Sequence, residues 1–184
     1  MNLQQLIREA KQGSSAAEKC LFDEFGGKML ALCCRYVKSP EDAEEIMLDG
    51  FCKFLKGLHA FQYQSDAALY MWLKKMMVNE CLMFLRRKNN FNMVRETDAE
   101  EIPLQEEALN NLSAAEIFSM IVQLPVGYRT VFNLHIMEGM EHKEIAETLG
   151  ITEGTSKSQL SRAKSLLQKL LTQKGVSYAK QQSR

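Results

Sequence analysis

Two helical patterns separated by a glycine occupy residues 144–171 and restrict the possible folds more than any other part of the chain. The first pattern places Ile145, Ala146 and Leu149 on one apolar face, and Gly150 follows as a helix stop that tolerates a positive φ. The second pattern is an apolar seam with a spacing of three or four residues: Leu160, Ala163, Leu167 and Leu170. A short turn between two such helices is the arrangement that lets the second helix enter a DNA major groove.

The balance of charge changes within this segment. Residues 138–153 contain five acids and one Lys, whereas residues 154–184 contain seven Lys or Arg and no acid. Hydroxyl and cationic side chains suit phosphate and base-edge contacts, and they predominate opposite the Leu160 seam. A solvated amphipathic helix is the alternative, but the glycine-centred turn and the charge change favour DNA contact. The predicted open face comprises Lys157, Ser158, Ser161, Arg162, Ser165 and Lys169.

The same segment resembles region 4, the C-terminal promoter-reading domain of extracytoplasmic-function (ECF) sigma factors of bacterial RNA polymerase. The matching motifs are Leu124-Pro125, Tyr128-Arg129, Glu144-Ile145-Ala146, Gly154-Thr155, Lys157-Ser158 and Arg162-Ala163-Lys164. Ser156 departs from the family pattern, which usually has an apolar residue such as Val at this position. The resemblance implies contact with the promoter −35 element through Thr155, Lys157, Ser158, Ser161, Arg162, Ser165 and Arg129.

Residues 39–58 form the pattern of one amphipathic helix. Ser39 is the expected N-cap, Pro40 occupies the first helical position, and Asp42 is placed to complete a capping box. The helix resembles region 2.2 of the family, which docks on the β′ coiled coil of core RNA polymerase. Gly50 departs from this pattern, and a glycine inside a helix costs about 1 kcal/mol against alanine. The predicted core stripe is Ile46, Met47, Phe51, Phe54 and Leu58. The resemblance implies polymerase contacts by Asp42, Glu45, Leu48, Asp49 and Lys53, with Leu48 in place of a Gln.

Residues 61–88 resemble regions 2.3 and 2.4, which open the promoter and capture a base flipped out of the −10 element. The matching residues are Trp72-Leu73, Met76-Met77, Asn79, Leu82 and Leu85-Arg86-Arg87, whereas Met83 stands where the family often has Asp or Asn. We interpret Trp72 as a core residue. Capture of an unstacked base needs an aromatic or amide-bearing pocket and cations for the backbone. The predicted pocket comprises Phe61, Tyr63, Gln64 and Tyr70, Asn79 is expected to assist opening, and phosphate contacts are assigned to Lys74, Lys75, Arg86, Arg87 and Lys88.

A length of 184 residues suits two small helical domains. Apolar residues make up 46% of the chain, only three Pro interrupt it, and no convincing alternating strand occurs, so an all-α fold is expected. The predicted organisation is a region 2-like domain at 1–88, a flexible acidic linker at 89–111, a region 4-like helix-turn-helix domain at 112–172 and a basic tail at 173–184. The first domain is expected to begin with helices at Asn2–Lys11 and Ser14–Val37, and the second with a capping box formed by Ser113 and Glu116. The linker is either a solvated tether or, as the resemblance implies, a strand that threads the RNA channel of polymerase.

The cysteines and histidines show no metal-ligand or catalytic spacing. We interpret the five cysteines as reduced core residues, and the three histidines as scattered residues with no partner pattern for a metal or for catalysis. No phosphate-binding glycine loop, nucleophile elbow or carboxylate constellation is present, so we expect no cofactor, no metal and no enzymatic activity. Without a signal peptide or a long apolar run, a cytoplasmic location is expected. The cysteines are Cys20, Cys33, Cys34, Cys52 and Cys81, and the histidines are His59, His135 and His142.

The formal net charge of zero favours a subunit of a larger machine over a free DNA-binding protein, because non-specific affinity depends on neutralised phosphates. The leading hypothesis is an ECF sigma factor that binds core polymerase through the β′ coiled coil and the β flap, reads −35 and −10 elements and melts the start site. The family implies an anti-sigma factor as a further partner. One alternative is a polymerase-recruiting adaptor brought to DNA by another protein. The other alternative is an autonomous helix-turn-helix regulator, such as the output domain of a two-component response regulator. A typical response regulator adds a doubly wound α/β receiver domain, and the sequence has no alternating βα pattern.

Overall fold

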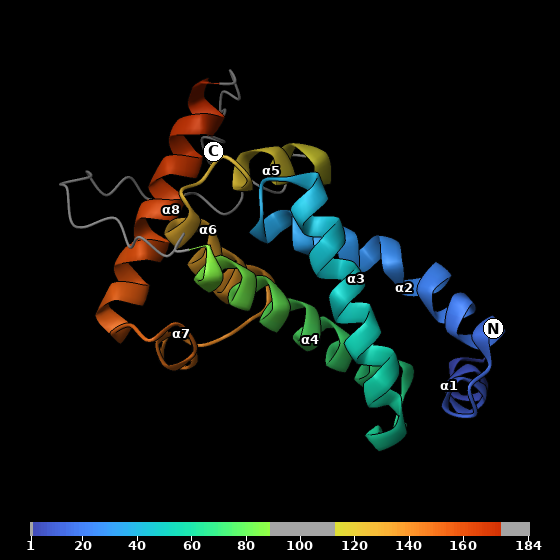
Figure 1. Cartoon of the computed structure of the whole chain (residues 1–184). Helices are drawn as coiled ribbons and strands as arrows, with labels where there is room; N and C mark the ends of the chain where they lie inside the picture. The colour runs from blue at the N-terminus through green and yellow to red at the C-terminus, as the bar shows by residue number, and fades with distance from the viewer. Residues whose placement is uncertain (1, 89–112, 174–184) are drawn as a thin grey trace, which may run out of the picture. The chain divides into compact units, whose positions relative to one another are not determined.

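The computed structural model describes residues 2–88 and 113–173, and every regular element in these ranges is a helix. The chain divides near residue 90 into two compact units, which are described separately (Figure 1). The predicted all-α fold class is therefore confirmed. The predicted linker at 89–111 lies outside the described residues, as does the predicted tail except Gln173, at which the last helix ends.

The first unit consists, within residues 2–88, of four α-helices and a short 3-10 turn. These are α1 (Leu3–Lys11), α2 (Ser15–Tyr36), α3 (Pro40–Gly57), η1 (Leu58–Ala60) and α4 (Asp66–Arg87). Each α-helix begins after a polar N-cap whose side chain accepts a backbone N–H: Asn2, Ser14, Ser39 and Ser65. Gly13, with φ of 83°, turns the chain between α1 and α2. The predicted helix starts at Asn2, Ser14 and Ser39 are confirmed.

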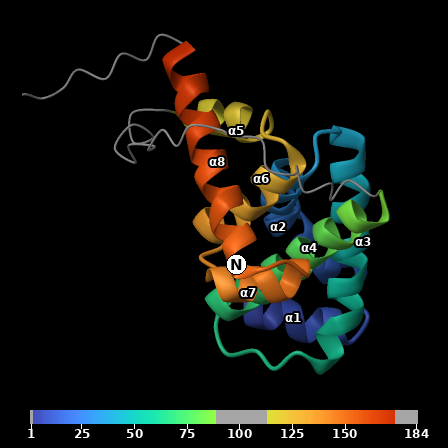
Figure 2. The ribbon, with the colours of Figure 1, turned by 90° about the vertical axis from the view of Figure 1, so that its left-hand side faces the viewer.

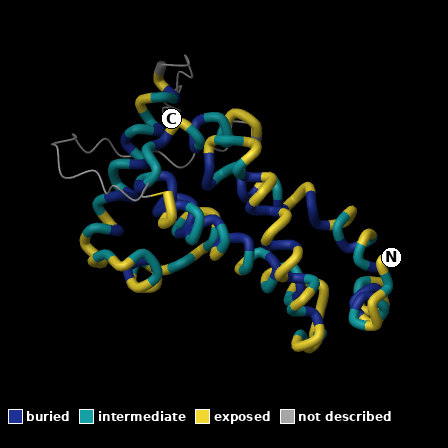
Figure 3. Tube along the Cα trace, in the orientation of Figure 1, coloured by how far each residue is buried: buried dark blue, intermediate teal, exposed yellow. Residues whose placement is uncertain are grey.

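α2, α3 and α4 pack against one another around an aromatic cluster. The Phe51 ring lies edge-on to Phe22 at 5.0 Å and to Phe54 at 5.2 Å, measured between ring centroids. Trp72 extends the cluster at 5.4 Å from Phe54, which supports its interpretation as a packing residue. Buried positions recur along these helices in Figure 3. The predicted stripe of α3 and η1 is buried in full: Ile46, Met47, Phe51, Phe54 and Leu58.

Gly50 allows a close approach between α3 and α4. A Cβ atom at this position would lie 2.6 Å from Met77 Sδ and 3.1 Å from Met77 Cε. A larger residue at position 50 therefore requires Met77 to move. The departure from the family pattern has a packing reason, which offsets the intrinsic cost of a helical glycine.

The second unit is built around its last helix. Its elements are α5 (Ala114–Ile121), α6 (Val126–Phe132), the π-helical segment η3 (Asn133–Met137), α7 (His142–Leu149) and α8 (Glu153–Gln173). α8 packs against α5, α6 and α7, with α7 near its N-terminal end and α5 nearer its C-terminal end (Figure 2). Gly150 has φ of 69°, so the predicted helix stop between α7 and α8 is confirmed. The predicted seam needs one correction, because Leu171 is fully buried and Leu170 is only half-buried.

Side-chain capping of the helix starts is confirmed at one predicted box and corrected at the other. Ser113 and Glu116 form the predicted capping box at the start of α5. At the start of α3, Ser39 accepts the Asp42 backbone N–H at 3.0 Å, but the Asp42 carboxylate pairs with Lys88 instead of returning to Ser39. A further box, between Glu141 and Glu144 at the start of α7, was not predicted.

Candidate DNA and polymerase surfaces

The N-terminal half of α8 presents the polar side chains predicted to contact DNA. Lys157 is exposed and forms an i,i+4 ion pair with Glu153 at 2.7 Å. Thr155 is fixed at the start of the helix, since its backbone N–H donates to Thr152 Oγ1 at 3.0 Å. Ser158, Ser161 and Arg162 are half-exposed. This open face therefore offers two cations and several hydroxyls on successive turns, the side-chain types that suit phosphate and base-edge contacts.

Two residues predicted to contact the −35 element are buried. Arg129 is 2% exposed, and its Nη1 donates to the Val122 and Leu124 carbonyl oxygens at 3.1 Å each. Burial lowers the pKa of the Arg129 guanidinium to about 10, which still leaves it charged at neutral pH. The prediction that Arg129 contacts DNA is wrong for this geometry, because its guanidinium holds the connection between α5 and α6. Ser165 is 4% exposed, so the prediction that it contacts DNA is also wrong for this geometry.

His135 of η3 and His142 at the start of α7 stack against each other, a contact that the sequence analysis did not predict. Their ring centroids are 4.4 Å apart and the rings are nearly parallel, at 14°. His135 Nδ1 lies 2.8 Å from the Met140 carbonyl oxygen, and His142 Nδ1 lies 2.9 Å from Ser156 Oγ. Ser156 is fully buried, so its hydroxyl replaces the family's apolar residue as a partner for His142.

The environment of this pair disfavours a second positive charge. Burial and then the neighbouring His135 lower the pKa of His142 below its ordinary range. From α8, Lys157 and Lys164 act in the same direction, and Glu153 opposes them. The native second unit therefore binds a proton at His142 less readily than the unfolded chain does.

Acidification is expected to destabilise the second unit. The unfolded chain takes up the proton first, so stability is full above the ordinary histidine pKa of about 6.5 and falls as the pH drops from there toward the lower native pKa. Urea unfolding between pH 7.5 and 5.5 is the measurement, and His142→Gln should flatten the dependence. His59→Gln, at an exposed position of the first unit, is the matched control. Equal pH slopes for the wild type and His142→Gln would contradict this assignment.

The exposed side of α3 carries the predicted polymerase contacts. Glu45, Leu48 and Asp49 are exposed to solvent, and Leu48 is 45% exposed although it is apolar. Asp42 and Lys53 also lie on this helix, but Asp42 forms an ion pair with Lys88, the C-cap of α4, at 2.9 Å, and Lys53 forms one with Glu80 of α4 at 2.6 Å. Met83, which departs from the family pattern, is half-buried and lines a small hollow between α3 and α4. Its lining is Glu45, Ile46, Asp49, Glu80, Met83, Phe84 and Arg87.

The residues predicted to form one base pocket have separate surroundings. The Phe61 ring stacks on Trp72 at 4.6 Å and 14°. Tyr70 packs toward Phe25, with ring centroids 6.3 Å apart. Tyr63 donates a short hydrogen bond to Asp66, which raises the pKa of the Tyr63 phenol, and Gln64 is exposed. Asn79, Arg86 and Arg87 are exposed on α4, as is its C-cap Lys88, whose Nζ lies 4.5 Å from the centroid of the Phe84 ring.

The cysteines are all free, but they do not share one environment. Cys33 and Cys81 are buried, and a hydrogen bond to Cys33 together with burial raises the pKa of Cys81. Cys52 is exposed, so the core interpretation was wrong for this residue. Within the described residues, no group of three or more His, Cys, Asp or Glu side chains is arranged to hold a metal ion. In the same part of the chain, no helix combines the length and apolar character needed to cross a membrane.

The protein has two compact helical units: α3 of the first exposes acidic side chains and Leu48, and α7 and α8 of the second form a helix-turn-helix, an element typical of DNA-binding proteins. The family model described as Sigma-70 region 2 matches residues 21–91, and the model described as Sigma-70, region 4 matches residues 109–167. The region 2 match corresponds to most of the first unit and the region 4 match to most of the second, in the family's order. The chain belongs to the sigma-70 family, among its ECF sigma factors.

Similar curated proteins come from several bacteria. The ECF RNA polymerase sigma-E factor of Haemophilus influenzae is 27% identical over 179 residues, which covers 90% of this chain and 93% of the relative. The RNA polymerase sigma-H factor of Pseudomonas aeruginosa is 29% identical over 91% of this chain and 93% of its own length. The ECF RNA polymerase sigma factor SigM of Mycobacterium tuberculosis is 31% identical over 73% of this chain and 66% of its own length. A solved structure titled "Structure of CnrH in complex with the cytosolic domain of CnrY" matches with a TM-score of 0.46 and 23% identity, covering 91% of this chain and 96% of that one.

Proposed function

We propose that this protein directs core RNA polymerase to promoters as an ECF sigma factor and promotes opening of the start site. The observation that carries this function is the presence, in order, of both sigma-70 regions on two compact helical units. Its partners are core polymerase and promoter DNA, and it acts where polymerase acts, in the bacterial cytoplasm. Sigma factors carry no chemistry of their own, so no catalytic group is assigned.

Each unit has a separate task in this proposal. The open face of α8, formed by Thr155, Lys157, Ser158, Ser161 and Arg162, enters the major groove of the −35 element. The exposed side of α3 docks on the β′ coiled coil through Glu45, Leu48 and Asp49. The segment from Phe61 to Tyr70, with Asn79, Arg86, Arg87 and Lys88 on α4, holds the opened −10 element.

Further contacts follow from the family. The second unit meets the β flap of polymerase, and residues 89–111 pass along the RNA channel, where six acids suit a basic surface. An anti-sigma factor covers the docking surfaces until a signal releases them.

Transcription from purified components tests the function. Core polymerase with the full chain is expected to initiate at start sites that a genomic start-site map assigns to this protein, and core alone is not. Binding to core without promoter-dependent initiation indicates the adaptor alternative. Binding to promoter DNA without any binding to core indicates an autonomous regulator, and either result would overturn the proposal.

Charge reversal on α3 should weaken the polymerase complex. Glu45→Lys combined with Asp49→Lys replaces an exposed acidic pair by cations, and like charges brought together at an interface cost several kcal/mol. We expect core binding to weaken by about tenfold or more, with helicity unchanged. The control, Asp23→Lys with Glu24→Lys, makes the same change of net charge at exposed positions of α2. Equal core affinity of the α3 variant and the wild type, measured by fluorescence anisotropy, would show that the docking surface lies elsewhere.

A further inference from the structure

A buried polar contact joins the two helices of the helix-turn-helix. His142 is the first residue of α7, and its Nδ1 lies 2.9 Å from Oγ of Ser156 on α8. The Ser156 side chain is fully buried at a position where the family usually has an apolar residue such as Val. A valine would pack there without needing a hydrogen-bond partner. The contact is therefore a feature of this chain and not of the family's helix-turn-helix in general.

The burial of Ser156 determines the direction of this hydrogen bond. A serine hydroxyl has one hydrogen, and a buried hydroxyl hydrogen needs an acceptor. Among the residues that the structure describes, His142 Nδ1 is the one atom placed to accept it. We therefore assign the lone pair of neutral His142 to Nδ1 and its hydrogen to Nε2. Protonation of His142 makes both ring nitrogens donors, so the Ser156 oxygen then accepts and its own hydrogen is left without an acceptor.

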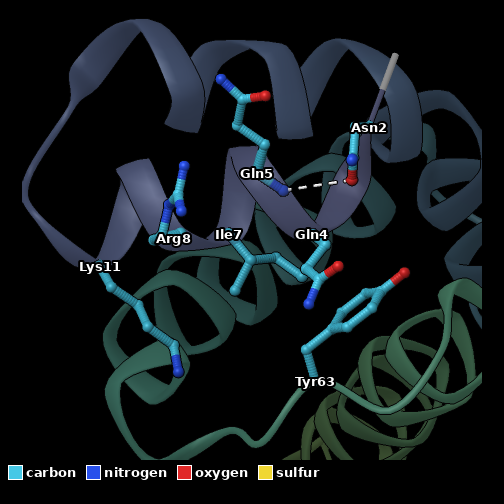
Figure 4. A pocket seen from close by; sticks show the side chains of 7 residues that line it. All are labelled: Asn2, Gln4, Gln5, Ile7, Arg8, Lys11 and Tyr63. Carbon is cyan, nitrogen blue, oxygen red and sulfur yellow. Dashed lines mark hydrogen bonds between the residues drawn. The ribbon is translucent and has the colours of Figure 1, made fainter.

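Solvent cannot supply the missing acceptor at Ser156. In the first unit, by contrast, Asn2, Gln5 and Arg8 are exposed around a pocket of about 400 Å³ beside α1 (Figure 4). Water can bind such exposed groups, so the loss of one hydrogen bond there costs little. The Ser156 hydroxyl has no solvent exposure and carries the full cost of an unpaired donor.

The elements that pack against α7 also oppose a charge on His142. His135, from η3, stacks on its ring with the centroids 4.4 Å apart. From α8, Lys157 and Lys164 repel a proton on His142, and Glu153 attracts it. Burial, followed by His135, is the largest cause of the lowered pKa of His142. A proton on His142 therefore favours states in which α7 has separated from α8.

We propose that His135, His142 and Ser156 make the packing of α8 on α7 depend on proton binding, so that mild acid removes −35 recognition and leaves polymerase docking intact. Lys157 and Arg162, which face the −35 element in the proposed function, lie on α8 close to this contact. None of the three residues lies in the first unit, which carries the docking helix α3. The effect on promoters rests on the proposed sigma function, whereas the change in helix packing does not.

Hydrogen exchange of the full chain at pH 7.5 and 5.5, corrected for the intrinsic effect of pH on exchange, measures the packing change. Amides of α7 and of the first turns of α8 should lose protection in acid by roughly 5- to 150-fold, the factor that corresponds to one unpaired buried donor. Ser156→Val removes the hydroxyl and should lose less protection than the wild type. His142→Gln retains an acceptor without a titratable group and should keep its protection at pH 5.5. His59→Gln, at an exposed position of the first unit, is the matched control and should behave as the wild type.

Binding of the reconstituted holoenzyme to a promoter, and to the same promoter with its −35 element replaced, measures the consequence for DNA. Preference for the intact −35 element should fall by about tenfold from pH 7.5 to 5.5 with the wild type and stay constant with His142→Gln, while both bind core polymerase at either pH. Equal loss of protection in the wild type, Ser156→Val and His142→Gln would overturn the inference, and so would a wild-type −35 preference that is the same at both pH values. A wild type without −35 preference at pH 7.5 would contradict the sigma function, and the exchange experiment would still decide the packing change.

Discussion

Arg129→Ala is expected to destabilise the second unit by roughly 2–5 kcal/mol. The Arg129 guanidinium is almost completely buried and supplies a hydrogen-bond donor to two carbonyl oxygens, those of Val122 and Leu124. Its removal leaves the buried Leu124 carbonyl without this donor, at about 1–3 kcal/mol, removes the donor of the part-buried Val122 carbonyl and opens a cavity. These carbonyls lie in the connection between α5 and α6. Their hydrogen bonds to Arg129 therefore stabilise the packing of both helices on α8.

Hydrogen exchange resolved by mass spectrometry measures this effect segment by segment. Amides of α5, α6 and α8 should lose protection in Arg129→Ala, whereas α2 to α4 should keep theirs. Arg129→Lys retains the charge but not the forked geometry of the guanidinium. Its amide protection should therefore lie between that of Arg129→Ala and that of the wild type. Lys169→Ala, at an exposed position of α8, is the surface control. Full protection of the second unit combined with weaker −35 binding would restore the DNA contact that the sequence motif implied for Arg129.

The helix starts were predictable from sequence because caps are local. Ser14, Ser39 and Ser113 each hydrogen-bond a backbone N–H three residues ahead, and Gly150 adopts the left-handed conformation that a helix stop requires. None of these depends on a distant partner. The apolar stripe of α3 was equally accessible, since its period alone determines which face is buried.

Contacts between residues distant in the sequence were not accessible in this way. A glycine at position 50 is unusual inside a helix. The reason for it is Met77, which lies 27 positions later and on another helix. Arginine is among the residues least often fully buried, so the motif around Arg129 indicated a DNA contact rather than a structural one. The stacking of His135 on His142 depends on the turn formed by η3 and the residues after it, which no periodicity predicts.

The candidate sites also divide into surfaces that local helical spacing predicts and a pocket that depends on contacts between distant residues. The open face of α8 and the exposed side of α3 followed from helical spacing and charge, and the structure places most of their residues as expected. The base pocket did not, because Phe61 and Tyr70 each have another aromatic neighbour.

Arg162→Ala is expected to reduce −35-dependent promoter binding by roughly 1–3 kcal/mol, a loss of about 5- to 150-fold. Arg162 is half-exposed on the open face of α8, and an arginine in a major groove can pair bidentately with guanine. Because such a contact reads one base, preference at one −35 position should relax while the other positions keep theirs. Lys169→Ala should instead weaken all sequences alike and reduce the salt slope by about one.

Transcription by the reconstituted holoenzyme from a panel of −35 variants separates readout from folding. Leu160→Asp is the structural control, since it buries an unpaired charge in the α8 seam and should abolish output from every promoter. Arg162→Ala should change the ranking of the panel with helicity intact, which an unfolded domain cannot do. If Arg162→Ala and the wild type ranked every variant alike with equal output, α8 would not be the recognition helix. Recruitment to DNA by a second protein would then become the leading explanation of the retained polymerase-docking unit.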